Sequence, residues 1–148
     1  MRTRAALVPR LVWNVTTATT ATANSGTLHL PLADAYAWIF DSGAGTGTSP
    51  TLDFAIQISP DGGTTWYSAT KLTQITTSAT KTMIVHGNGP IQGQAAAATA
   101  IADTGSAVTS NFPMTDSVRI LATIGGTNPS YASIKVWCIP IYQQGRQQ

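Results

Sequence analysis

The sequence predicts an all-β protein, most economically one antiparallel β-sandwich of about seven to nine strands, with the jelly roll as one candidate topology. Only 9% of the 148 residues are charged, and the six acidic residues are all Asp, so the chain lacks the Glu on which surface helices draw. Thr, a β-branched residue that suits a pleated surface, takes the place of charge. Short apolar runs are separated by turn residues rather than by helical periods.

A chain of 148 residues suits one domain. We expect a basic N-terminal arm at 1–10, a single sandwich domain at 11–142 and a C-terminal tail at 143–148. Inside the domain, 87–113 shows no clear strand pattern, and its alanine-rich middle fits either a short helix or an extended path. A segment of this length without strands usually carries a contact, so we expect a projecting loop near 87–113.

The arm carries three arginines and no acidic residue: Arg2, Arg4 and Arg10. This cluster fits an arm that docks on an acidic neighbour or on nucleic acid, and it equally fits an ordinary solvated terminus. A formal net charge of +2 is too small to predict a nucleic-acid or membrane partner. Pro9 and Arg10 interrupt the apolar stretch, so the segment does not match a secretory signal.

The first strands follow the arm. The β-prone run 11–20, the turn Asn24-Ser25-Gly26 and the short run 27–30 together predict a first hairpin. The run 35–40, with three aromatic residues, predicts a buried strand, and the Gly-rich stretch 41–47 predicts the loop that ends it.

The clearest strand lies at 52–59, where large apolar residues alternate with smaller or polar ones. This period of two places Leu52, Phe54, Ile56 and Ile58 on one face of a sheet. The turn residues Pro60-Asp61-Gly62-Gly63 follow, and 64–72 is expected to return as the second strand of a hairpin.

The last strands are regular again. We expect a strand at 81–86, a strand at 117–124, a turn at 125–130 with the sequence GGTNPS, and a final strand at 132–142. Both faces of that final strand are largely apolar, so it is predicted to be central or covered by a neighbouring subunit. Pro140 lacks an N–H and marks where pairing on one side stops.

One motif is specific. Ser59, Asp61, Gly63, Thr65 and Trp66 match the S-x-D-x-G-x-T-W pattern of the Asp-box, a hairpin element found in sialidase-type propellers and in unrelated β proteins. In physical terms, the Asp61 carboxylate accepts backbone N–H groups across the turn, Gly63 takes a backbone angle that other residues resist, and Trp66 packs over the hairpin. The match covers eight residues, so it predicts a folding device rather than a sialidase.

The inventory of reactive side chains predicts a non-enzymatic protein without a catalytic, metal or cofactor site. His29 and His86 stand without partnering motifs, and two histidines with Cys138 do not supply a zinc site. Cys138 alternates with apolar residues and is expected to be buried. Asp41 and Asp53 are the main candidates, with Asp61, for a catalytic carboxylate pair, but Asp41 and Asp61 occupy positions typical of structural Asp.

Two interpretations are open for the four tryptophans of the chain, which are Trp13, Trp38, Trp66 and Trp137. They could form a sugar-stacking platform, as in a carbohydrate-binding module. Because each lies in or beside an expected strand, packing in the core or between subunits is favoured.

Taken whole, the chain resembles the small β-rich structural proteins of tailed-phage virions, particularly capsid decoration (cement) proteins. The resemblance rests on the arm MRTRAALVPR, the nearly uncharged Thr/Ala/Gly-rich strands, the SPDGGTTW hairpin and the closing pair VRILATIGG and ASIKVWCIPIY. Phage tail, fibre and head–tail joining proteins share these features.

The resemblance implies a virion protein on the capsid surface that binds the major capsid protein or other virion proteins and stabilises the assembled lattice. It also implies a homo-oligomer, often a trimer, with no membrane partner; a nucleic-acid partner is disfavoured. Other phage components and a carbohydrate-binding sandwich module remain as alternatives. The expected partner contacts are Arg2, Arg4, Arg10, Ile91, Gln92, Gln143 and Arg146.

Overall fold

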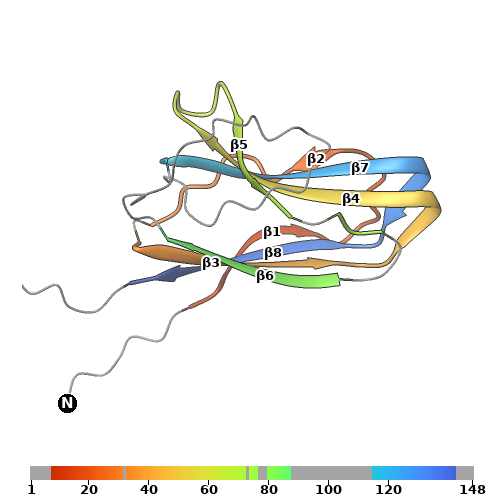
Figure 1. The fold of residues 1–148 in the computed structure, drawn as a ribbon, viewed down its shortest axis with the longest axis horizontal. Coiled ribbons are helices and arrows are strands. Elements are labelled where there is room, and N and C mark those ends of the chain that lie inside the picture. Colours follow the sequence, from red (N-terminus) through yellow and green to blue (C-terminus); the bar gives the residue numbers. More distant parts are fainter. Residues whose placement is uncertain (1–7, 32, 73, 77–79, 88–114, 143–148) are drawn as a thin grey trace, which may run out of the picture.

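The protein is an eight-stranded β-sandwich over the residues that the computed structural model describes, and these residues contain no helix. They are 8–31, 33–72, 74–76, 80–87 and 115–142. Two four-stranded antiparallel sheets lie one above the other (Figure 1). The all-β antiparallel sandwich predicted from the sequence is therefore confirmed.

The strands fall into two sheets, here termed sheet A and sheet B. Sheet A has the order β1-β8-β3-β6 and sheet B the order β2-β7-β4-β5. The bounds are β1 Arg10–Val15, β2 Ala23–Asn24, β3 Ala35–Ser42, β4 Gly45–Ser59, β5 Tyr67–Lys71, β6 Thr80–Gly87, β7 Ser117–Tyr131 and β8 Ile134–Ile141.

This strand order is that of a jelly roll. Each of the first four strands pairs with one of the last four, taken in reverse order. β1 pairs with β8, β2 with β7, β3 with β6 and β4 with β5. The resulting ribbon is rolled up, so that β8 also meets β3 and β7 also meets β4. An eight-stranded double sheet of this kind is the jelly roll that the sequence allowed as one candidate.

The core lies between the sheets and is rich in aromatic residues. Trp38 and Phe40 from β3 and Phe54 from β4 are completely buried, and the rings of Phe40 and Phe54 meet across the sandwich with centroids 5.0 Å apart. Leu52 and Ile56 are also completely buried beside Phe54, as the alternation in 52–59 predicts. Side chains therefore fill the space between the two sheets.

Two of the connections that cross from one sheet to the other, at 43–44 and at 132–133, are only two residues long and lie at the same end of the sandwich. The two crossings touch, because the Gly43 N–H donates to the Ser133 carbonyl oxygen at 2.9 Å. A Cβ on Gly43 would lie 2.9 Å from the Ser133 nitrogen. A glycine at position 43 thus lets the two crossings pack side by side.

Two predicted loops are parts of long strands, so these predictions were wrong. In the expected loop 41–47, residues 41 and 42 belong to β3, and β4 already begins at Gly45. The expected turn 125–130 lies inside β7, which continues to Tyr131 and pairs with β4. The turn residues serve as bulges, since the register shifts between Thr46 and Thr51. Positive φ angles occur at Gly47, Ser49, Gly126 and Asn128.

The predicted first hairpin was also wrong. β1 and β2 lie in different sheets, where they pair with β8 and β7, and Leu28 forms only an isolated bridge with Val118. The Asp61 hairpin joins β4 to β5, although β5 begins at Tyr67 rather than at residue 64. The expected strand 81–86 corresponds to β6. The last strand, β8, lies between β1 and β3 and is central as predicted.

Several predicted segments lie outside the described residues. These are the arm up to residue 7, the tail 143–148 and all but the first residue of the expected loop 87–113. Arg10, which we expected to end the arm, is the first residue of β1 and pairs with Cys138.

Candidate functional site

The outer face of sheet A is apolar. Side chains alternate along a strand, so the residues between the buried ones point away from the core. The outward residues of β3, β8 and β1 include seven apolar ones, which we name the apolar face: Leu11, Ala35, Ala37, Ile39, Trp137, Ile139 and Ile141. None of them belongs to the core cluster or to the side chains packed against it, although Ala37 is itself buried, with 6% of its surface exposed.

Large side chains on this face remain accessible to solvent. Leu11 is 48% exposed, and Val8 and Tyr142, which flank the face along the chain, are 67% and 51% exposed. Ile39 and Trp137 are half-buried. Monomeric soluble proteins rarely expose contiguous apolar surface of this kind, so the face is a candidate contact with another molecule.

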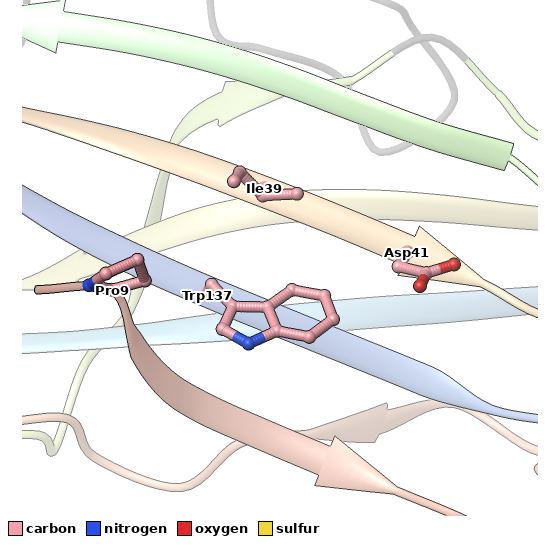
Figure 2. A pocket seen from close by; sticks show the side chains of 4 residues that line it. All are labelled: Pro9, Ile39, Asp41 and Trp137. Atoms are coloured by element: carbon pink, nitrogen blue, oxygen red, sulfur yellow. The ribbon is translucent and has the colours of Figure 1, made fainter.

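An open pocket of about 320 Å³ lies on the same face. Figure 2 shows its lining residues: Pro9 before β1, Trp137 on β8, and Ile39 and Asp41 on β3. Asp41 is opposite Lys135 in the register of β3 and β8, and both side chains are half-buried. In the register, Asp41 is also opposite Lys81 of β6, and Lys135 is opposite Asn14 of β1. Charged and polar residues are therefore grouped at one end of a surface that is apolar along the rest of β3 and β8.

The outer face of sheet B is different, because its side chains form polar contacts with one another. The Arg119 Nε donates to the Gln57 Oε1 at 2.7 Å, and the Gln57 Nε2 donates to the Ser68 Oγ at 3.2 Å. The Gln74 Nε2 donates to the Asp53 Oδ2 at 2.9 Å. The two outer faces thus differ in character, with polar groups paired on sheet B and apolar groups displayed on sheet A.

The Asp61 hairpin is held by its own side chains. The Asp61 Oδ1 accepts the backbone N–H of Thr65 at 2.7 Å and of Thr64 at 3.2 Å, and the Ser59 hydroxyl donates to the same oxygen at 2.7 Å. The Gly63 N–H donates to the Ser59 Oγ at 2.8 Å. Hydrogen bonds from Thr65 above all, and from Ser59, lower the pKa of Asp61 to about 2.

Trp66 closes the hairpin. Its indole N–H donates to the Gly63 carbonyl oxygen at 2.9 Å, and Gly63 has a φ of +99°, where glycine is favoured. The Arg119 guanidinium stacks over the Trp66 ring at 4.4 Å from the centroid. The side chains of Ser59, Asp61 and Trp66 are thus each engaged by groups of the hairpin itself, which supports a structural role.

The candidate catalytic residues do not converge. Asp41 lies on the outer face of sheet A, Asp53 on the outer face of sheet B and Asp61 at the hairpin, and His29 is exposed. Cys138 is buried, which raises the pKa of its thiol to about 12. Across the described ranges, no group of three His, Cys, Asp or Glu residues is placed to hold a metal ion. The side chain of His86 lies outside the description.

The four tryptophans occupy four different environments. Trp38 is completely buried, and Trp13 packs against the core. Trp66 lies under Arg119 near sheet B, and Trp137 is on the outer face of sheet A. No outer surface therefore carries the two exposed rings that a stacking platform of tryptophans needs.

The expected contact residues are placed only in part. Arg10 is exposed at the start of β1, whereas Arg2, Arg4, Ile91, Gln92, Gln143 and Arg146 lie outside the described residues. The described part of the chain holds no helix long and apolar enough to cross a membrane. No family model, curated protein or solved structure matches the chain.

Sequence reasoning found only one strand of the apolar face, because it noted that both faces of the final strand are largely apolar and predicted that this strand is central or covered by a neighbouring subunit. The signal was present in β8, whose outward residues Trp137, Ile139 and Ile141 are as apolar as its inward ones. The contribution of Ile39 and Asp41 could not be found in this way, because pattern alone does not show that β3 lies beside β8.

Proposed function

We propose that this chain is a non-enzymatic structural subunit that binds other protein surfaces, and that within this class it is a tailed-phage virion protein of the capsid decoration type. The observation that carries the proposal is the apolar face, which stands opposite a face whose polar groups are already paired. A partner that covers the apolar face removes large side chains such as Leu11 and Trp137 from water.

The fold is compatible with this proposal, but it is also compatible with other functions. Jelly rolls occur in viral capsid domains, in lectin domains and in cupins, so topology alone does not assign a function. A cupin-like site would lie between the sheets, where Trp38, Phe40 and Phe54 are completely buried. The outer surface is therefore the better place to look for the function.

The test is cofractionation with virus particles. Particles from the source culture are separated on a density gradient, and the chain is quantified in each fraction against the major capsid protein. We expect the chain in the capsid fractions at a fixed ratio, and we expect it to remain there after a high-salt wash, because salt screens charges but does not weaken an apolar contact. A chain found only among free soluble proteins contradicts the proposal.

Carbohydrate binding is a second candidate, and the pocket on sheet A favours it. Trp137 offers an aromatic surface and Asp41 a carboxylate acceptor within the same pocket. A glycan array probed with the wild-type chain and with Trp137→Ala tests this function. Binding that is lost in the variant supports a lectin-like role, and an array without hits dismisses it.

A further inference from the structure

We propose that the apolar face is the contact between two copies of this chain, related by a two-fold axis that runs parallel to β3 and β8 and midway between them. The inference rests on the proposed function, because it names a partner for the same face. The argument uses the residues that the register of β3 and β8 places side by side.

The outward residues of β3 and β8 form three apolar pairs, and two of these pairs join a large residue to a small one. Ile139 on β8 stands opposite Ala37 on β3, and Ile141 stands opposite Ala35. A two-fold axis between the strands places β8 of each copy over β3 of the other at the same level along the strands. Ile139 and Ile141 of each copy then meet Ala37 and Ala35 of the other, and close packing at these two levels follows from the difference in size. At the third apolar level, Trp137 meets Ile39, so two large side chains contact each other there.

The same two-fold rotation brings the oppositely charged residues of the two copies together. Asp41 and Lys135 are opposite each other in the register, so each meets the oppositely charged residue of the second copy. Over the ranges that the structure describes, neither side chain takes part in an ion pair or a side-chain hydrogen bond within its own chain. A two-fold contact supplies both with partners, and it does so twice in each dimer.

The size of the face suits a stable dimer. The whole outer face of sheet A, which extends beyond the apolar face to β6, has four strands about 4.8 Å apart. With the two central strands eight residues long at about 3.3 Å per residue, this outer face measures roughly 19 by 26 Å, or about 500 Å² in projection. Projecting side chains such as Trp137 have more accessible surface than this projection. The face therefore approaches the roughly 800 Å² per partner of a typical interface.

The experiment is a charge-reversal series read by molar mass. Sedimentation equilibrium across a concentration series is run on the wild type, on Asp41→Lys, on Lys135→Asp, on the double variant and on an equimolar mixture of the two single variants. Thr123→Lys, which introduces the same lysine side chain on the outer face of sheet B, is the control for the added lysine. Urea unfolding of each variant shows that the fold is retained.

We expect the wild type and Thr123→Lys to have twice the 15.4 kDa mass of one chain. Each single reversal creates two like-charge contacts in a dimer, so we expect its self-association to weaken by about 100-fold. The double variant restores both attractive contacts. The mixture of single variants also does so, because each new charge meets its opposite in the other variant, and a mixed dimer is expected.

Four outcomes overturn the inference: a monomeric wild type, a trimer, a dimer that the single reversals leave intact, and single variants that stay monomeric when mixed. Failure here is distinguishable from failure of the proposed function. A monomer that still cofractionates with capsids refutes the two-fold contact and leaves the structural role standing, whereas a dimer absent from particles does the opposite.

Discussion

Removal of the Tyr131 hydroxyl tests the hydrogen bonds that connect the end of β7 to Ile75 and Thr76, in the segment that follows β5. Tyr131 ends β7 and is completely buried, and its hydroxyl donates to the Thr76 carbonyl oxygen at 2.9 Å and approaches the Ile75 carbonyl oxygen at 3.2 Å. Tyr131→Phe removes these bonds and leaves the ring in place. The change therefore isolates the hydrogen bonds from the packing.

The expected loss of stability depends on which hydrogen-bond donors the Ile75 and Thr76 carbonyl oxygens keep in the variant. The Ile75 carbonyl oxygen still accepts the Leu52 N–H at 2.8 Å, so it stays satisfied. The Thr76 carbonyl loses its described donor, but Thr76 is exposed and water can replace the hydroxyl in part. A buried acceptor left without a donor costs about 1–3 kcal/mol, and partial access to water places this loss near about 1 kcal/mol.

Urea and thermal unfolding measure the loss. A loss of about 1 kcal/mol corresponds to about 2–4 °C in Tm for a chain of this size, with the urea m-value unchanged. Tyr142→Phe is the control, because Tyr142 is 51% exposed, and its effect is expected to stay within about 0.5 kcal/mol. Equal stability of Tyr131→Phe and wild type, or a loss above about 3 kcal/mol, refutes the reasoning.

Three further changes probe the core, the hairpin and the bulges. Phe54→Ala removes a completely buried ring and is expected to cost about 3–5 kcal/mol in urea unfolding, with a smaller loss for Phe54→Leu. The pKa of Asp61 is about 2 in the folded state and 3.8 in the unfolded state. Its contribution to stability is therefore present above pH 3.8 and is lost as the pH falls towards 2. In unfolding measured at several pH values, we expect Asp61→Asn to weaken this dependence of stability on acid pH. Gly126→Ala puts a Cβ 2.6 Å from the Ser49 carbonyl oxygen at a φ of +112° and is expected to lower Tm more than Gly62→Ala, where nothing lies within 4 Å. Equal Tm values for the two glycine variants contradict the bulge interpretation.

Local patterns predicted the fold where local physics decides the structure. The alternation in 52–59 placed Leu52, Phe54 and Ile56 in the core because a strand presents one face every second residue. The hairpin motif is equally local, since Ser59 and Asp61 bind backbone groups within four residues. These parts needed no knowledge of the rest of the chain.

Sequence reasoning failed where tertiary pairing overrides a local preference. Glycine and asparagine at 125–130 are typical of a turn, but the facing segment of β4 carries matching irregularities, so the two strands bulge together and continue. The run 11–20 has no hairpin partner nearby because its partner is β8, more than 100 residues away. Strand order is a property of the whole roll, so sequence reasoning could find the apolar outer face of β8 but not its continuation onto β3.

The core and the proposed contact surface use opposite faces of the same strand. On β8, Ile134, Val136 and Cys138 point inward and are buried, whereas Trp137 and Ile139 point outward and lie outside the core cluster. Because side chains alternate, the outward residues can change without opening a cavity between the sheets. An apolar outer row is thus not a by-product of core formation: polar residues at these positions would leave the sandwich equally able to close, as the outer face of sheet B demonstrates with Gln57 and Arg119. The apolar character of sheet A is best explained by a surface that covers it.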